Sequence, residues 1–168
     1  MVRAGIVIDS SLNATFSTSF PERADRDNLC QPALCEGVWE FPVTNFVDHP
    51  PAGCRPLHVC ACSFGEFSTI LEQAERAGWS YIVMVLHSFE FVRVNRISTG
   101  RVGLRRLLAA RFERLCAYLA NNAARFRTCH FADVDLGALQ AAKSVAPLVS
   151  SRVRTLRRYA EQALSLVY

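Results

Sequence analysis

Lysine and long apolar runs are what this chain of 168 residues has least of. Eighteen of its nineteen basic side chains are arginine, and Lys143 is the exception. The longest candidate apolar run, Tyr81 to Leu86, has the length of a strand and falls far short of the roughly 18 residues that a membrane span needs. No apolar segment near the N-terminus has the form of a secretory signal, so we expect a cytoplasmic protein without a membrane span.

The seven cysteines lack the pattern of a disulfide framework or a zinc finger. Their number is odd, the chain is not tiny, and no C-x2-C pair occurs, which favours a reducing compartment. Cys60 and Cys62 lie two apart and share one face of a predicted strand, while Cys30, Cys35 and Cys54 lie in loop-like sequence. A zinc site built from these is conceivable, but buried reduced thiols fit the spacing better.

Charge is divided unequally between the two halves of the chain. Residues 1–92 carry five basic and eleven acidic side chains, and residues 93–168 carry fourteen basic and four acidic ones, so the halves have net charges of −6 and +10. A basic half suggests an anionic partner such as nucleic acid. The alternative is a set of solvated helix faces, which we favour because no aromatic residues are interleaved as a base-stacking surface requires.

Apolar periodicity predicts one α/β domain, since 51% of the residues are apolar and only 20% are charged. A capping box, Ser63 with Glu66, predicts where the first helix begins, and Gly78 predicts where it ends. A polar loop from Thr15 to about Glu36 and a basic loop over 93–103 are expected. The predicted strands cover 5–9, 38–44, 57–62, 79–86 and 126–131, and the later helices cover 104–124 and, as a pair, 136–167, the second from 149 to 166.

Parallel strands joined by helices place their chemistry at the carboxyl ends of the strands. That rule selects Asp9 to Asn13, Thr44 to His49, Ser63, and His87 with Ser88. We therefore take these strand ends as the places where a site is expected.

Three ordered segments carry a resemblance to a known family. Gly5-Ile6-Val7-Ile8-Asp9-Ser10-Ser11-Leu12-Asn13 is a strand ending in polar residues, Trp39-Glu40-Phe41-Pro42-Val43 has the form W-E-x-P-V, and Val83-Met84-Val85-Leu86-His87-Ser88 ends a late strand on histidine. Together with the segments 111–115 and 126–128, they make residues 3 to 135 resemble NodB-type polysaccharide deacetylases.

The resemblance implies a partial or distorted (β/α) barrel of mostly parallel strands over 1–135, with a C-terminal helical extension over 136–168 that packs on the same domain. It further implies metal-dependent hydrolysis of N-acetyl groups on amino-sugar glycans, with a divalent metal such as zinc as cofactor and a carbohydrate as partner. His87 would protonate the leaving amine or stabilise the oxyanion, and Asp9 would support the catalytic residues.

Three further residues are candidates for binding the sugar. Asn13 and Thr44 would line a sugar groove, and Trp39 would stack on a sugar ring. Each has a structural alternative, which for Trp39 is packing in the core and for Asp9 is capping of the Ser-rich turn that follows it.

The chain departs from the family pattern at the metal. It contains no Asp-Asp-Gly motif and no His-x3-His pair, so the sequence assigns no metal ligands, and the resemblance implies that it corresponds to the C-terminal portion of the domain. Two alternatives therefore stay open beside a deacetylase: a non-catalytic homologue that binds a glycan or a partner chain, and, as the weakest, an Arg-rich binder of nucleic acid or anionic surfaces. An exposed sheet edge would favour a homo-oligomer unless the helices after Leu136 cover it.

Overall fold

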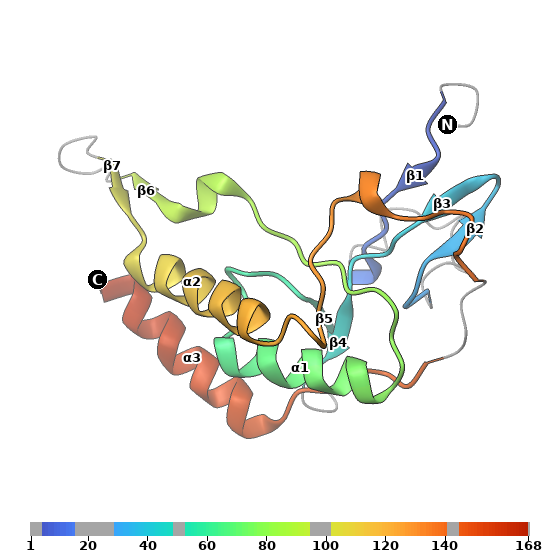
Figure 1. The fold of residues 1–168 in the computed structure, drawn as a ribbon. Helices are drawn as coiled ribbons and strands as arrows, with labels where there is room; N and C mark the ends of the chain where they lie inside the picture. The colour runs from blue at the N-terminus through green and yellow to red at the C-terminus, as the bar shows by residue number, and fades with distance from the viewer. Residues whose placement is uncertain (1–4, 16–28, 49–52, 95–101, 141–144, 168) are drawn as a thin grey trace.

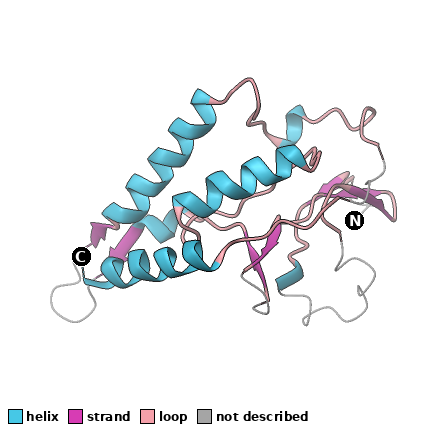
Figure 2. Cartoon of the chain, turned by 90° about the horizontal axis from the view of Figure 1, so that it is seen from below, coloured by secondary structure: helices cyan, strands magenta, loops and turns pink. Residues whose placement is uncertain are grey.

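The computed structural model describes residues 5–15, 29–48, 53–94, 102–140 and 145–167 (Figure 1). Within these ranges the chain is a mixed α/β structure with three α-helices and three small sheets. The helices are α1 (Phe64–Arg76), α2 (Arg106–Asn121) and α3 (Arg152–Val167). They gather at one end of the molecule, and the sheet that contains β1 lies at the other end (Figures 1 and 2).

The first sheet has the strand order β1-β3-β2, formed by β1 (Ile8–Asp9), β2 (Ala33–Cys35) and β3 (Val38–Glu40). β1 runs parallel to β3, with Ile8 opposite Trp39, and β2 runs antiparallel to β3. Glu36 and Gly37 join β2 to β3 with positive φ angles of 53° and 81°, which is the backbone that a tight two-residue hairpin requires. The predicted loop up to Glu36 is therefore wrong over Ala33–Cys35, because this turn returns the chain onto β3.

Segments 57–59 and 83–85 are far apart in the sequence but pair with each other through parallel backbone hydrogen bonds. The N–H of Val85 donates to the carbonyl of Leu57 at 3.0 Å, and the N–H of Val59 donates to the carbonyl of Val85 at 3.1 Å. Thr44 extends the same network, since its N–H donates to the carbonyl of Val83 and its own carbonyl accepts from Leu57. These bonds give the predicted strands 57–62 and 79–86 a short parallel pairing centred on His58 and Val85.

Two antiparallel hairpins complete the strands of the described chain. β4 (Asn45–Val47) pairs with β5 (Cys54–Pro56), and β6 (Val92–Val94) pairs with β7 (Val102–Leu104). The predicted basic loop over 93–103 is thus wrong at both ends, where alternate β-branched and leucine side chains favour pairing. The residues between β6 and β7 lie outside the described ranges.

α1 begins as the sequence predicts. The backbone N–H of Ser63 donates to Oε2 of Glu66 at 2.8 Å, and the N–H of Glu66 donates to Oγ of Ser63 at 3.3 Å, which completes the capping box. Gly78, with a φ of +73°, follows the last turn and lets the chain reverse. The apolar face of α1 enters a core whose buried members are Phe46, Leu57, Val59, Cys62, Phe67, Ile70, Leu71, Ala74, Trp79, Leu108, Leu115 and Leu148.

α2 and α3 flank α1. α2 turns Leu108 and Leu115 into the core, and its predicted span of 104–124 is shortened by two or three residues at each end. α3 agrees with the second predicted C-terminal helix and is tied to α1 through Arg154, whose Nε donates to the carbonyl of Gly65 at 3.2 Å. Within the described part of the chain, every helix is too short or too polar to cross a bilayer.

Two predicted elements are wrong. The predicted strand 126–131 is extended chain without a neighbouring strand, followed by a 3-10 turn over Phe131–Asp133 (η5). The first predicted C-terminal helix is absent from 136–140 and 145–149. In the first segment, Asp135 accepts hydrogen bonds from the N–H groups of Gly137 and Ala138. In the second, Leu148 is buried and the next residue, Val149, pairs through its main chain with Val47. Local turn chemistry and burial of one leucine override the helical pattern.

Candidate functional site

The parallel pairing of 57–59 with 83–85 delivers four polar side chains to one place. Cys60 follows His58 by two residues, while His87 and Glu90 follow Val85 through the 3-10 turn Ser88–Phe91 (η4). Because parallel segments end at the same edge of a sheet, side chains 30 residues apart in sequence meet there. We call His58, Cys60 and Glu90 the His58 cluster.

Ligand-type atoms in the His58 cluster converge closely. Nε2 of His58 lies 3.1 Å from Oε1 of Glu90, and Sγ of Cys60 donates to the same Oε1 at 3.1 Å. The sulfur is also 3.1 Å from Nδ1 and 3.9 Å from Nε2 of the imidazole. The side chains of His58 and Glu90 are only 17% and 11% exposed, so the cluster lies at the rim of the interior.

His87 completes the site from the solvent side. Its exposed ring meets the ring of His58 edge-on, with centroids 5.8 Å apart, and stacks on the ring of Phe89 at 5.1 Å. The backbone N–H of His87 donates to Oε2 of Glu90 at 3.2 Å, and the N–H of Glu90 donates back to the carbonyl of His87 at 3.0 Å. These two bonds fix the carboxylate of Glu90 relative to the backbone of His87.

The electrostatics of the cluster oppose a free thiolate. Burial, reinforced by the hydrogen bond to Glu90, raises the pKa of Cys60 to about 12. Burial alone would raise the pKa of Glu90, but the Cys60 thiol, the His87 N–H and the two imidazoles outweigh it and hold that pKa below its usual value. The carboxylate therefore stays charged at neutral pH and the thiol stays protonated.

The donor set fits the divalent metal that the family resemblance implies. Imidazole nitrogen, cysteine sulfur and carboxylate oxygen are all ligands of zinc, and one such atom from each of the three residues lies within 4.8 Å of the others. Three protein ligands with an open position are typical of catalytic zinc sites, whereas structural sites are closed by four.

Asp9 and Asn13, two other predicted site residues, lie outside the His58 cluster and form hydrogen bonds with residues two positions further along the chain. The carboxylate of Asp9 accepts from the N–H and hydroxyl of Ser11 at 3.1 and 3.0 Å, and Oδ1 of Asn13 accepts from Thr15. Asp9 thus caps the turn after its strand, which is its structural alternative. Within the described part of the chain, His87 makes no hydrogen bond or ring contact with either residue, and it contacts the His58 cluster instead. His49, also expected at a strand end, lies outside the described residues.

Thr44 and Trp39 have structural positions as well. Thr44 is buried, and its Oγ1 accepts from the N–H of Val83 at 2.9 Å, which holds the two segments together. Trp39 is half-buried in β3, the central strand of the first sheet. Thr44 therefore supports the paired segments that present the site, whereas Trp39 belongs to the first sheet.

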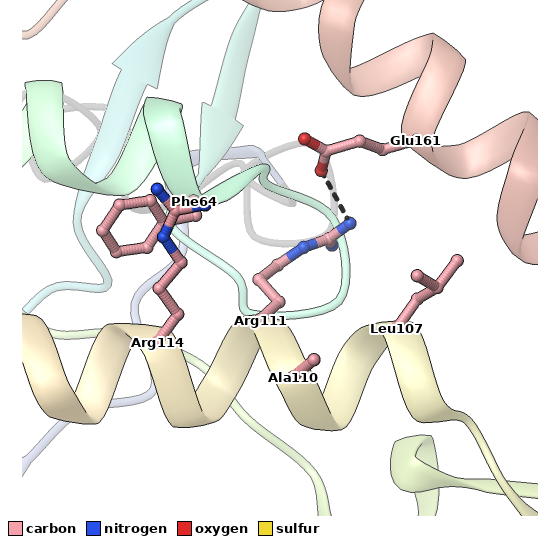
Figure 3. A pocket seen from close by; sticks show the side chains of 6 residues that line it. All are labelled: Phe64, Leu107, Ala110, Arg111, Arg114 and Glu161. Carbon is pink, nitrogen blue, oxygen red and sulfur yellow. Dashed lines mark hydrogen bonds and ion pairs between the residues drawn. The ribbon is translucent and has the colours of Figure 1, made fainter.

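A pocket of about 280 Å³ lies between the N-terminal end of α1, α2 and α3 (Figure 3). Its cationic groups are engaged: Arg111 pairs with Glu161 at 3.2 Å, and the guanidinium of Arg114 lies 4.1 Å from the centroid of the Phe64 ring. An anion entering this pocket would compete with Glu161. Its lining residues are Phe64, Leu107, Ala110, Arg111, Arg114 and Glu161.

Comparison with family models, with characterised proteins and with solved structures found no match to this chain.

The sequence pointed to His87 but passed over His58, Cys60 and Glu90. His58 lies inside a predicted strand, where a core histidine is the ordinary expectation, and the spacing of Cys60 predicts a buried thiol. The available signal was His58-x-Cys60 on one strand, followed by a carboxylate three residues beyond the histidine that ends the paired strand. Only the parallel pairing shows that these residues meet.

Proposed function

We propose that this chain is a polysaccharide-deacetylase-like hydrolase that removes N-acetyl groups from amino-sugar glycans, with His87 as its proton-transfer residue. The observation that carries the proposal is the position of His87, at the end of a parallel-paired segment and in ring contact with the His58 cluster. The ordered motifs around Asp9, Trp39 and His87 support the same family.

The chemistry requires water to add to the acetyl carbonyl and the carbon–nitrogen bond to break as the amine takes up a proton. His87 is suited to both proton movements, because its exposed ring can accept the proton of the attacking water and return it to the leaving nitrogen. Stacking on Phe89 orients this ring, and the bond from the backbone N–H of His87 to Glu90 holds the main chain that carries it. A divalent metal held by His58, Cys60 and Glu90 would polarise the acetyl carbonyl and lower the pKa of the attacking water.

A glycan would approach from the side of Phe89. This side chain is 70% exposed although it stacks on His87, so an apolar face is available directly beside the proposed proton donor. Apolar and aromatic surfaces with a few placed polar groups are typical of ligand sites. We place the sugar ring or the acetyl methyl group against Phe89.

The test is release of acetate from an N-acetylated chito-oligosaccharide by the purified 168-residue chain supplied with zinc. We expect His87→Asn to lower the rate by about 10²- to 10⁴-fold, the usual contribution of general acid–base catalysis. The matched control is His130→Asn, because His130 is exposed and N-terminal to η5, and its rate should equal that of the parent. Equal rates for the parent and His87→Asn, or no acetate release by the parent, would overturn the proposal.

A second candidate, a glycan-binding homologue without catalysis, is favoured by one observation. Asp9, which would support the catalytic residues, instead uses both carboxylate oxygens to accept from the N–H and hydroxyl of Ser11. Binding of the chito-oligosaccharide by calorimetry, unchanged in His87→Asn and without acetate release, would select this function over hydrolysis.

A further inference from the structure

We propose that His58, Cys60 and Glu90 form a zinc site that binds the metal through Nε2, Sγ and Oε1 and leaves a fourth position open. This location differs from the Asp and His-x3-His ligands that the family resemblance implies, and this chain lacks those motifs. The inference deepens the proposed function, since it names the metal site that hydrolysis would use, but the donor atoms argue for it independently of any activity.

The spacing of the three donor atoms matches a metal. Their mutual distances are 3.1 Å from nitrogen to oxygen, 3.1 Å from sulfur to oxygen and 3.9 Å from sulfur to nitrogen. Tetrahedral zinc with bonds of about 2.0 to 2.3 Å separates its ligand atoms by roughly 3.3 to 3.8 Å. The observed distances bracket this spacing, so small side-chain adjustments suffice to admit the ion.

The residues around the cluster hold the donors in place. Nη1 of Arg111 donates to the carbonyls of Val59 and Cys60 at 3.4 and 3.3 Å, which anchors the backbone that carries the sulfur. The N–H of His87 holds Oε2 of Glu90, which leaves Oε1 turned toward His58 and Cys60. In most metal sites, hydrogen bonds from surrounding residues orient the side chains that coordinate the metal.

The donor types select the metal. Magnesium and calcium prefer oxygen ligands, whereas a set of sulfur, imidazole nitrogen and one carboxylate suits zinc. The open position faces His87 and Phe89, the exposed side of the cluster, where a water or a substrate carbonyl can enter.

A cysteine nucleophile activated by histidine is the competing interpretation of the same three residues. In that arrangement the imidazole stands between the thiol and the carboxylate. Here the imidazole of His58 does contact both groups, with Nδ1 3.1 Å from the sulfur and Nε2 3.1 Å from Oε1 of Glu90, but the sulfur also donates directly to the same Oε1 at 3.1 Å. A carboxylate against the sulfur opposes formation of a thiolate unless a cation lies between them.

The test is titration of metal-free protein with Co²⁺ in reducing buffer. We expect one equivalent to bind with a thiolate-to-cobalt charge-transfer band in the near ultraviolet, and zinc to displace it. Cys60→Ser should abolish the band, and His58→Asn and Glu90→Gln should each weaken binding at least tenfold. The matched controls are Cys116→Ser on α2 and Cys129→Ser, both at exposed cysteines, which should bind as the parent does.

The outcomes separate the metal site from the hydrolase. A band that persists in Cys60→Ser would overturn the site, as would absence of binding by the folded parent. Should Cys60→Ser lose its far-ultraviolet circular dichroism, the His58→Asn and Glu90→Gln titrations decide the question. Metal binding without acetate release would keep the site and remove the hydrolase, whereas acetate release without metal binding would do the reverse.

Rapid alkylation of Cys60 in the metal-free protein at neutral pH would support the nucleophile instead. We expect Cys60 to react with iodoacetamide more slowly than exposed Cys116, and zinc to protect it further. Faster reaction of Cys60 than of Cys116 would contradict the metal site.

Discussion

Arg158 of α3 and Glu66 of α1 form an ion pair that is completely enclosed: Nη1 lies 2.7 Å from Oε1, and both side chains are 0% exposed. The second guanidinium nitrogen, Nη2, reaches Oδ2 of Asp48, just after β4, at 2.8 Å. Thr155 and Ser63 supply further hydrogen bonds to the two carboxylates. One side chain of α3 thereby joins the C-terminal helix to the first turn of α1 and to the end of a strand.

Removing the cation from this network should be costly. We expect Arg158→Met to lower the free energy of unfolding by about 3 to 5 kcal/mol, because Asp48 and Glu66 would remain buried without their shared partner. Urea denaturation at pH 7 measures the loss. The matched control is Arg157→Met. Its side chain is 65% exposed and pairs with Glu161 one turn away, so the change should stay below about 1 kcal/mol.

A double-mutant cycle with Glu66→Gln checks that the cost comes from the pair. The cycle should show a coupling of about 1 to 3 kcal/mol, since the two side chains contact each other directly. Additive losses would mean that Arg158 acts through packing of its stem alone.

The cap of α1 offers a second test. Ser63→Ala removes the hydroxyl that accepts from the N–H of Glu66 and donates to its carboxylate, so we expect a loss of about 1 to 2 kcal/mol. Thermal or urea unfolding measures it. Ser68→Ala in the same helix is the control, because Ser68 only bonds back to the carbonyl of Gly65, and its loss should be smaller. Equal losses in the two variants would contradict a special role for the cap.

Features determined by neighbouring residues were predictable from the sequence. The capping box of α1 needs only Ser63 and Glu66, and the three helices have the apolar spacing that the sequence shows. The burial of Arg158 could not be predicted in this way. An arginine on an amphipathic helix predicts a solvated side chain, and only the packing of α3 against Asp48 and Glu66 reveals a fully buried one.

The candidate site was predictable only in part, for a similar reason. His87 lies at a strand end, which sequence rules select. His58 and Glu90 are 32 residues apart, and their meeting depends on the parallel register that sets His58 beside Val85. Strand register follows from long-range packing, so no local pattern encodes it.

Gln31 provides a third test, of contacts between the first sheet region and residues 80–81. Its Oε1 accepts from the N–H groups of Ser80 and Tyr81 at 2.8 and 3.1 Å, and its Nε2 donates to the carbonyl of Tyr81 at 2.9 Å. We expect Gln31→Ala to lower the free energy of unfolding by about 1 to 3 kcal/mol, because these backbone groups would lose their partners. Gln140→Ala, at an exposed glutamine, should change it by less than about 0.5 kcal/mol. Equal effects in chemical denaturation would contradict the bridging role.

Cys62 gives the stability of the protein a dependence on alkaline pH. Burial of this completely enclosed thiol raises its pKa to about 11 from an ordinary value of 9.0. The unfolded chain therefore releases the proton first as the pH rises above about 9, which favours unfolding until the folded thiol also ionises near 11. Cys62 alone should lower the free energy of unfolding by about 2 to 3 kcal/mol over this window, at roughly 1.4 kcal/mol per pH unit.

Urea denaturation between pH 8 and 11 in reducing buffer measures the slope, and a variant isolates its source. Cys62→Ala should have a shallower slope than the parent, whatever its absolute stability, because the titrating group is gone. The slope should not vanish, since the raised pKa of Cys60 acts in the same direction up to about 12. Cys116→Ser removes an exposed thiol and should keep the parent slope. Parallel curves for the parent and Cys62→Ala would show that the buried thiol does not control alkaline stability.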